Sequence, residues 1–205
     1  MRRARRYILR VRPDGSVRVT IPRGGSRAEA GRFFERHASW IQRERARIQS
    51  TPAVSRWTDG AALLLRGEPA TIHVDGGSAR YGDRVVKVTG DLRACLEADL
   101  RALARAELVP RLHALAATHD LTVARVTIRN QRSRWGSCSR SGAIALNFRL
   151  VQMPPTVRDY VLLHELMHLK QPNHSRRFWR LVEDVCPDFR SAEHWLKAEG
   201  RGLLP

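Results

Sequence analysis

Hydrophobic and polar residues alternate with a period of two at the start of the chain and then change to helical spacing. The alternating runs 7–11 and 17–21 flank Pro-Asp-Gly at 13–15, a pattern typical of a β-hairpin. Ser26 is placed to cap a helix that we expect to continue to about residue 48, because apolar side chains recur there every three or four positions.

Short apolar runs and glycines return between residues 57 and 89, and a long helical pattern follows them. The strand-like runs, each bounded by glycine-containing turns, lie at 63–65, 71–74 and 85–88. Asp91 can cap a helix that runs to about residue 119 with leucines along one side, and Pro110 is a point where this helix can bend or divide.

From residue 123 onwards the pattern predicts two strands, a polar loop and three helices. The expected ranges are strands at 123–128 and 143–150, a loop at 130–141, and helices at 156–170, 175–185 and 191–199. We therefore predict an α+β protein, with a β-rich basic subdomain in residues 1–90 and a second domain in residues 91–205.

The 205 residues carry a formal net charge of +17, and nearly all of the basic residues are arginine. Residues 1–50 hold 14 arginines against four acidic residues, and residues 125–158 contain no acidic residue. Such an excess of cations can bind DNA, another polyanion or a membrane surface. A coding bias toward arginine is the alternative, which explains the choice of arginine over lysine but not the excess over acids.

The composition also limits the class of protein. With 42% hydrophobic residues the chain can bury a core, and without a run of 18 apolar residues we expect no membrane-spanning helix. The start of the chain lacks the apolar stretch of a secretory signal. The three cysteines, Cys95, Cys138 and Cys186, are widely spaced, which argues against a cysteine zinc site and favours a reducing, cytoplasmic location.

Residues 164–168 read His-Glu-Leu-Met-His within a predicted helix. Residues four apart lie about 40° apart around a helix axis and about 6 Å along it, so His164 and His168 can bind one ion. Glu165 is rotated by about 100° from His164 and can act as general base on a metal-bound water without ligating the metal. Zinc lowers the pKa of such a water to about 7.

His174 is the candidate for a third ligand. Pro172 should end the helix near Lys170, so the chain can turn and bring His174 back to the metal. Three histidines and one water form the open tetrahedral arrangement of a catalytic zinc, for which we expect one Zn²⁺ ion. The alternative is that these histidines pack between helices and bind no metal.

Several motifs, taken in their order along the chain, resemble the YgjP-like metallopeptidases, relatives of the SprT-like and WLM zinc peptidases. They are Arg-Trp-Gly-Ser-Cys-Ser at 134–139, Leu-Asn-Phe-Arg-Leu at 146–150, Pro-Pro at 154–155, and the segment 164–179 that contains the three histidines. The resemblance is dense over residues 125–196 and looser over residues 1–50. Gln171 stands where metzincins have glycine, and no methionine follows His174, so their Met-turn is absent.

The resemblance implies that His164, His168 and His174 bind zinc and that Glu165 is the general base. It implies a minimal zincin-like fold, in which a small sheet packs on the metal-binding helix and an extended polypeptide substrate pairs with a sheet edge. The strand at 145–148 is the expected edge. The candidate substrate-binding residues are Arg134, Trp135, Asn147 and His194.

The sequence is compatible with three functions. The favoured one is an intracellular zinc metallopeptidase, whose basic segments 1–50 and 125–158 would bring it to DNA. The second is a zinc-dependent hydrolase of nucleotides or other phosphates, such as a nucleotide pyrophosphatase. The third is a nucleic-acid-binding module with a vestigial zinc site, against which the intact Glu165 argues.

Overall fold

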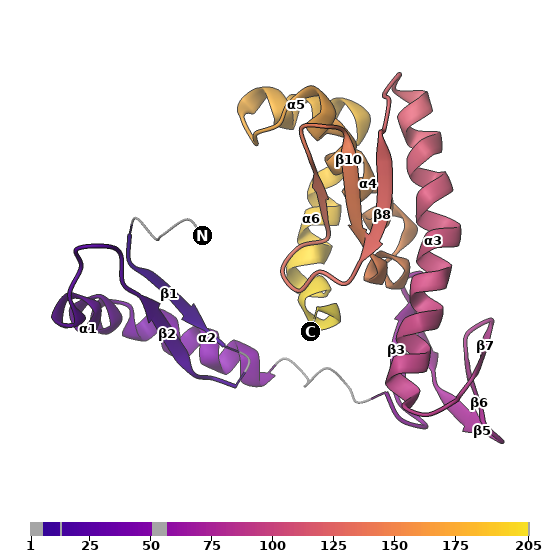
Figure 1. Cartoon of the computed structure of the whole chain (residues 1–205), viewed down its shortest axis with the longest axis horizontal. Coiled ribbons are helices and arrows are strands. Elements are labelled where there is room, and N and C mark those ends of the chain that lie inside the picture. Colours follow the sequence, from indigo (N-terminus) through magenta and orange to yellow (C-terminus); the bar gives the residue numbers. More distant parts are fainter. Residues whose placement is uncertain (1–5, 13, 51–56, 205) are drawn as a thin grey trace. The chain divides into compact units, whose positions relative to one another are not determined.

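The structure is a computed structural model that describes residues 6–12, 14–50 and 57–204, without the side chains of residues 47–50 and 201. The chain forms two compact units, residues 1–53 and residues 54–205, which are described separately (Figure 1). This division falls near residue 53, whereas the sequence analysis placed a boundary at residue 90. The difference arises because the strands that follow residue 57 share one core with the helix that begins at Leu92.

The first unit consists of a β-hairpin and two helices. Its elements are β1 (Ile8–Val11), β2 (Val17–Thr20), α1 (Arg27–Arg36) and α2 (Ala38–Ser50). The strands pair antiparallel, with Leu9 opposite Val19, which confirms the predicted hairpin; Pro13 of its turn lies outside the described residues. Ser26 caps α1 as predicted, and Glu29 completes a capping box with it.

The single helix predicted for residues 26–48 is wrong, because the helix is interrupted at His37. Nδ1 of His37 lies 2.8 Å from the Phe33 carbonyl oxygen, which is the acceptor that the His37 backbone N–H would use in a continuous helix. That N–H instead donates to the carbonyl oxygen of Phe34, three residues earlier rather than four. The side chain of His37 therefore competes with the helical hydrogen bond and separates α1 from α2.

The second unit begins with short antiparallel strands followed by a long helix. The elements are β3 (Ala62–Leu65), β4 (Glu68–Thr71), β5 (His73–Asp75), β6 (Ser78–Tyr81), β7 (Arg84–Lys87) and α3 (Leu92–Thr118). β3 pairs with β4, and β5, β6 and β7 form a three-stranded sheet. The single strand predicted at 71–74 is wrong, because the chain leaves strand geometry at Ile72, which separates β4 from β5. The strand β6 was not predicted, because only Ala79 and Tyr81 of this strand are apolar.

The helix α3 is continuous through Pro110, so the proline does not divide it. Leu108 and Leu112 are both fully buried on either side of it. The burial of this face stabilises the helix across the proline, although Pro110 cannot donate a backbone hydrogen bond.

The remaining elements carry the candidate site. They are β8 (Arg125–Arg129), β9 (Gly136–Cys138), β10 (Ala143–Asn147), the 3-10 helix η1 (Phe148–Gln152), α4 (Pro155–Lys170), α5 (Arg176–Val185), α6 (Phe189–Ala198) and η2 (Gly200–Leu203). The sheet has the order β8-β10-β9, with β8 parallel and β9 antiparallel to β10. In Figure 1 this sheet lies against α4, and α3 runs along its β8 side.

Two predicted ranges in this region need correction. The loop expected at 130–141 contains the strand β9, whose residues Gly136, Ser137 and Cys138 carry no strong apolar signal. The strand expected at 143–150 ends at Asn147, because the side-chain Oδ1 of Asn147 accepts a hydrogen bond from the Arg149 backbone and begins the 3-10 helix η1. The predicted α+β class is confirmed.

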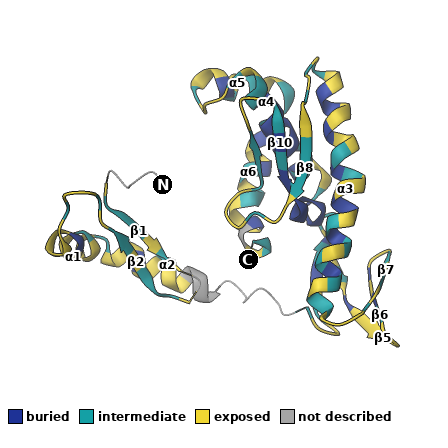
Figure 2. Ribbon diagram, viewed as in Figure 1, coloured by how far each residue is buried: buried dark blue, intermediate teal, exposed yellow. Residues whose placement is uncertain are grey.

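The core of the second unit lies where α3, α4, η1 and the sheet meet, as the dark blue segments of Figure 2 show. In contrast, Ala30 and Ile41 are the buried hydrophobic residues of the first unit, among those that the structure describes. None of the helices in the described parts of the chain has the length and apolar character needed to cross a bilayer.

The turn between β3 and β4 packs directly on the start of α4, which gives a testable prediction for stability. Both Gly67 and Gly60 have positive φ angles, of 91° and 76°, so alanine at either position costs about 1–2 kcal/mol in backbone strain. At Gly67 the new Cβ would also lie 2.8 Å from Cα of Pro154, whereas at Gly60 it would meet nothing within 4 Å. We expect Gly67→Ala to lower the free energy of unfolding by about 1–3 kcal/mol more than Gly60→Ala, measured by urea denaturation. Equal losses would contradict the close contact with Pro154.

Candidate metal centre

The helix α4 presents two histidines and a glutamate toward one side of the second unit. His164 and His168 are half-buried, and Glu165 is only 6% exposed. The helix ends at Lys170, and Gln171 has extended backbone angles (φ −141°, ψ 104°), as expected next to Pro172. The chain then turns, and Nε2 of His174 comes to 3.0 Å from Nε2 of His164.

The three histidines fit a single metal ion. One ring nitrogen from each of His164, His168 and His174 lies within 4.8 Å of the others. Two nitrogens bound to one tetrahedral zinc at about 2.05 Å are about 3.3 Å apart, close to the separation of His164 and His174. Nδ1 of His164 is buried and has no hydrogen-bond partner among the described residues, so the ring is not held in place by hydrogen bonding at that atom.

The protonation of the histidines also suits metal binding. Nδ1 of His168 lies 3.1 Å from the carbonyl oxygen of Gln171, which can only accept, so Nδ1 carries the proton and Nε2 is left with a free lone pair. Burial, and secondly the neighbouring imidazoles, lower the pKa of His164 to about 3. Burial also lowers the pKa of His168. Neutral imidazole is the form that binds a metal ion.

The aromatic ring of Phe178, on α5, holds the three imidazoles in position. Its centroid lies 4.9 Å from His164, 4.4 Å from His168 and 4.8 Å from His174. Phe178 is fully buried, so it cannot turn away without opening a cavity. The ring of Trp179 also lies beside this cluster, with its centroid 5.9 Å from that of His164 and 5.8 Å from that of His174. The packing of α5 on α4 therefore sets the orientation of the rings.

Glu165 lies against the backbone of β9. A Cβ at Gly136 would be 2.6 Å from both Cγ and Oε1 of Glu165, so only glycine leaves room for the carboxylate. Burial raises the pKa of Glu165 to about 7, and the positive charge of Arg134 opposes this rise. A carboxylate with a pKa near neutrality is suited to accept and return a proton.

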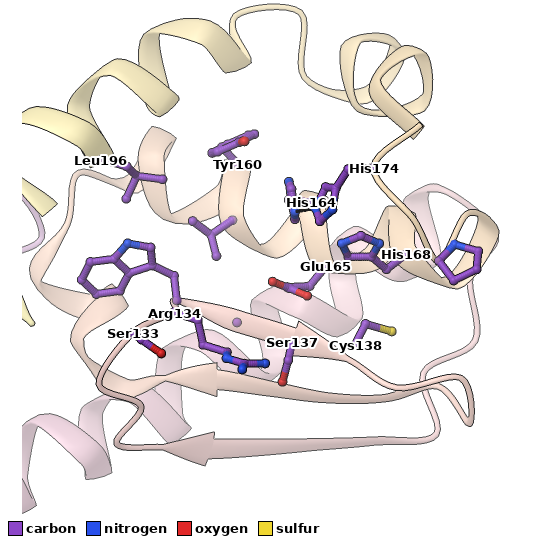
Figure 3. Close-up of a pocket in the computed structure, with 14 residues that line it drawn as sticks. Ser133, Arg134, Ser137, Cys138, Tyr160, His164, Glu165, His168, His174 and Leu196 are labelled. Carbon is purple, nitrogen blue, oxygen red and sulfur yellow. Dashed lines mark hydrogen bonds between the residues drawn. The ribbon is translucent and has the colours of Figure 1, made fainter. Parts of the chain in front are cut away.

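The histidines and Glu165 line an open cavity of about 570 Å³ between α4 and β9. Figure 3 shows Arg134, Ser137 and Cys138 on the strand side, with Tyr160 and the histidines on the helix side. Arg134 and Trp135, both proposed from the sequence, are among the lining residues. Asn147 and His194 are not, and His194 is exposed on α6.

Asn147 has a different position from the one expected. It is fully buried, and its Nδ2 donates to the backbone carbonyls of Gln131 and Arg134 at 2.8 and 3.2 Å. Its Nδ2 thus holds the loop that leads into β9, while its Oδ1 accepts a hydrogen bond from the Arg149 backbone in η1. The prediction that residues 145–148 form the sheet edge is also wrong, because β10 is the middle strand and β9 is the edge strand nearest to α4.

Gly136 and Tyr160 also belong to the site, although neither was predicted from the sequence. Tyr160 precedes His164 by four residues, so helical spacing alone places it on the same face of α4, and its ring lies 5.9 Å from that of His164. Its hydroxyl donates to Glu193 on α6. Gly136 lies within the motif at 134–139, but the motif did not reveal its role, because that role depends on contact with the side chain of Glu165, 29 positions away.

Cys138 also lines the cavity, but its chemistry is not that of a nucleophile. Burial, and secondly the charge of Glu165, raise the pKa of its thiol to about 11. The thiol is therefore protonated at neutral pH, so Cys138 serves as a small packing residue rather than a nucleophile.

The crystal structure of the metallopeptidase zymogen of Pyrococcus abyssi abylysin is 28% identical in sequence, covering 45% of this chain and 94% of that chain, with a TM-score of 0.39. Comparison with curated proteins gave no significant match. The family described as "YgjP-like, metallopeptidase domain" matches residues 5–199. Since this match spans nearly the whole chain, the protein belongs to the YgjP-like metallopeptidases and is a metal-dependent peptide hydrolase.

Proposed function

We propose that the chain cleaves peptide bonds with one zinc ion held by His164, His168 and His174 and with Glu165 as the general base. The observation that carries this proposal is the convergence of three imidazole nitrogens within 4.8 Å, beside a carboxylate that packs on an edge strand. An all-nitrogen set of three ligands suits zinc and leaves a coordination position open. When bound there, zinc would supply a nucleophilic water at neutral pH and polarise the substrate carbonyl.

Glu165 accepts the proton of the attacking water and passes it to the leaving amine. Its carboxylate packs against Gly136, so the backbone of β9 limits its movement on that side. The pKa of about 7 that burial gives this group lets it both take up and release a proton near neutral pH. Arg134, which lines the same cavity, favours the charged form of Glu165.

The substrate binds as an additional strand at the outer edge of β9. This strand pairs with β10 on one side only, through Ile144 opposite Cys138 and Leu146 opposite Gly136. An extended peptide can pair with the free edge through main-chain hydrogen bonds, which places a scissile carbonyl between β9 and α4. Arg134 and Trp135 at the start of this strand are placed to contact substrate side chains.

The cavity favours a peptide over a polyphosphate. Hydrolysis of nucleotides requires several cations around the phosphates. Arg134 is the one arginine among the described residues that line the cavity. An open strand edge instead complements the backbone of a polypeptide. The third alternative, a nucleic-acid-binding module with a vestigial zinc site, is disfavoured because such a site is not expected to keep Glu165.

Replacement of the general base tests the proposal most directly. We expect Glu165→Gln to retain zinc, because it alters no ligand, and to lower the rate of peptide hydrolysis by about 10²–10⁴-fold. The measurements are zinc content by elemental analysis and turnover of an unstructured protein such as casein. Hydrolysis at the wild-type rate would remove Glu165 from the mechanism.

The third ligand can be tested by metal affinity. We expect His174→Ala to weaken zinc binding by at least about 100-fold, since loss of a partner that only orients a ligand already costs about 10–100-fold. Competition with a chromophoric chelator gives the affinity. If it stays at the wild-type value, the third ligand is another residue.

Gly136 offers a test of the position of Glu165 that leaves every functional side chain intact. In Gly136→Ala the new methyl group must displace the carboxylate, and a shift of about 1 Å lowers the rate on the order of 10²-fold. We expect zinc content to be unchanged. Gly31→Ala is the matched control, because a methyl group there meets nothing within 4 Å. Full activity of Gly136→Ala would contradict the close packing of Glu165 on β9.

A further inference from the structure

The β1–β2 hairpin of the first unit has one face on the helices and one face turned away from them. The ring of Tyr7 lies 5.7 Å from that of Phe33 on α1, and its hydroxyl donates to Glu29 at 2.6 Å. The odd-numbered side chains of β1 therefore face the helices. Because side chains alternate along a strand, the even-numbered ones point outward.

The outward side of the hairpin is rich in arginine. The register places Arg10 directly opposite Arg18, and Ile8 opposite Thr20. Arg6 and Arg12 continue the same alternation at the two ends of β1, and all four arginines are exposed. We call this surface the arginine face; it consists of Arg6, Ile8, Arg10, Arg12, Arg18 and Thr20.

The positive charge at the centre of the arginine face is not compensated. Like charges directly opposite each other on adjacent strands destabilise the pair. Arg10 and Arg18 have no carboxylate partner among the residues that the structure describes. In the second unit, by contrast, Arg66, Arg84 and Arg111 each pair with a carboxylate. The hairpin thus retains a repulsive pair that a bound anion would relieve.

We propose that the arginine face binds duplex DNA, independently of the metal centre. Guanidinium groups bind phosphate oxygens in a bidentate geometry, and a two-stranded ribbon has the width of the B-form major groove. The narrow major groove of duplex RNA does not admit such a ribbon.

Other polyanions fit the same surface less well. A single strand is held by stacking on aromatic side chains, and the arginine face has none. Binding to a lipid surface is strengthened when several apolar residues insert in addition to the attraction of charge, whereas this face offers only Ile8 as an apolar residue. The combination of paired arginines and a narrow ribbon therefore favours the duplex.

The test uses the full-length protein and a fluorescein-labelled DNA duplex of mixed sequence, with binding measured by fluorescence anisotropy between 50 and 200 mM salt. We expect Arg10→Gln/Arg18→Gln to weaken binding at least about tenfold and to reduce the slope of log affinity against log salt concentration by about 2. Removal of the repulsive pair should not unfold the hairpin, which thermal melting checks. Peptide hydrolysis by this variant should equal that of the wild type, so the result does not depend on the proposed active site.

A second double variant controls for net charge. Arg80→Gln/Arg190→Gln removes two exposed arginines from the second unit and should change DNA affinity less than threefold. The proposal is overturned if the two double variants lose equal affinity, if the hairpin variant binds as tightly as the wild type, or if the wild type does not bind the duplex at 50 mM salt. Tighter binding to duplex RNA or to phosphatidylserine vesicles than to DNA would also overturn it.

Discussion

The burial of α4 is the constraint on which the rest of the second unit depends. Leu162, Leu166 and Met167 are fully buried in the core. The same stretch of helix must also direct His164, Glu165 and His168 into an open cavity. A helix turns by about 100° per residue, so functional and core residues necessarily alternate along it. The sheet, α5 and α6 surround α4 for this reason, and each of them also contributes to the site.

The elements that pack on α4 therefore both fill the core and shape the site. Phe178 on α5 fills the core and fixes the three imidazole rings, while Gly136 on β9 completes the sheet and admits the carboxylate of Glu165. Asn147 connects these layers, because its amide holds the loop that positions Arg134 and the start of β9. A substitution in any of these residues would alter the site through geometry rather than through direct contact with substrate.

The parts of the site that depend on local spacing could be predicted from the sequence. The separation of His164 and His168 by four residues requires only a helix, and the return of His174 requires only that Pro172 end it. The hairpin, the cap at Ser26 and the long helix from Asp91 follow equally from nearby residues. Each of these features is decided within a few turns of the chain.

The features that could not be predicted depend on contacts between distant residues. β9 is a strand because it pairs with β10, and its own residues, Gly136 to Cys138, have little strand propensity. Asn147 was expected in the cleft from the family resemblance, but its hydrogen-bond partners, Arg134 and Gln131, lie 13 and 16 positions away in the chain. The interruption at His37 is local, yet it was missed because apolar periodicity continues across it and a side-chain hydrogen bond does not appear in that pattern.

Burial also explains how the centre can be stable and reactive at once. Desolvation raises the pKa of Glu165 and lowers that of His164, so it disfavours the charged form of both groups. The protein thereby avoids isolated charges in its interior, whose cost would otherwise fall on the folding of α4. Neutral imidazoles can bind a divalent cation without first releasing protons, and a cation in turn favours the charged form of a nearby carboxylate. In the proposed mechanism, the same burial that stabilises the helix prepares Glu165 to act as a base when metal is bound.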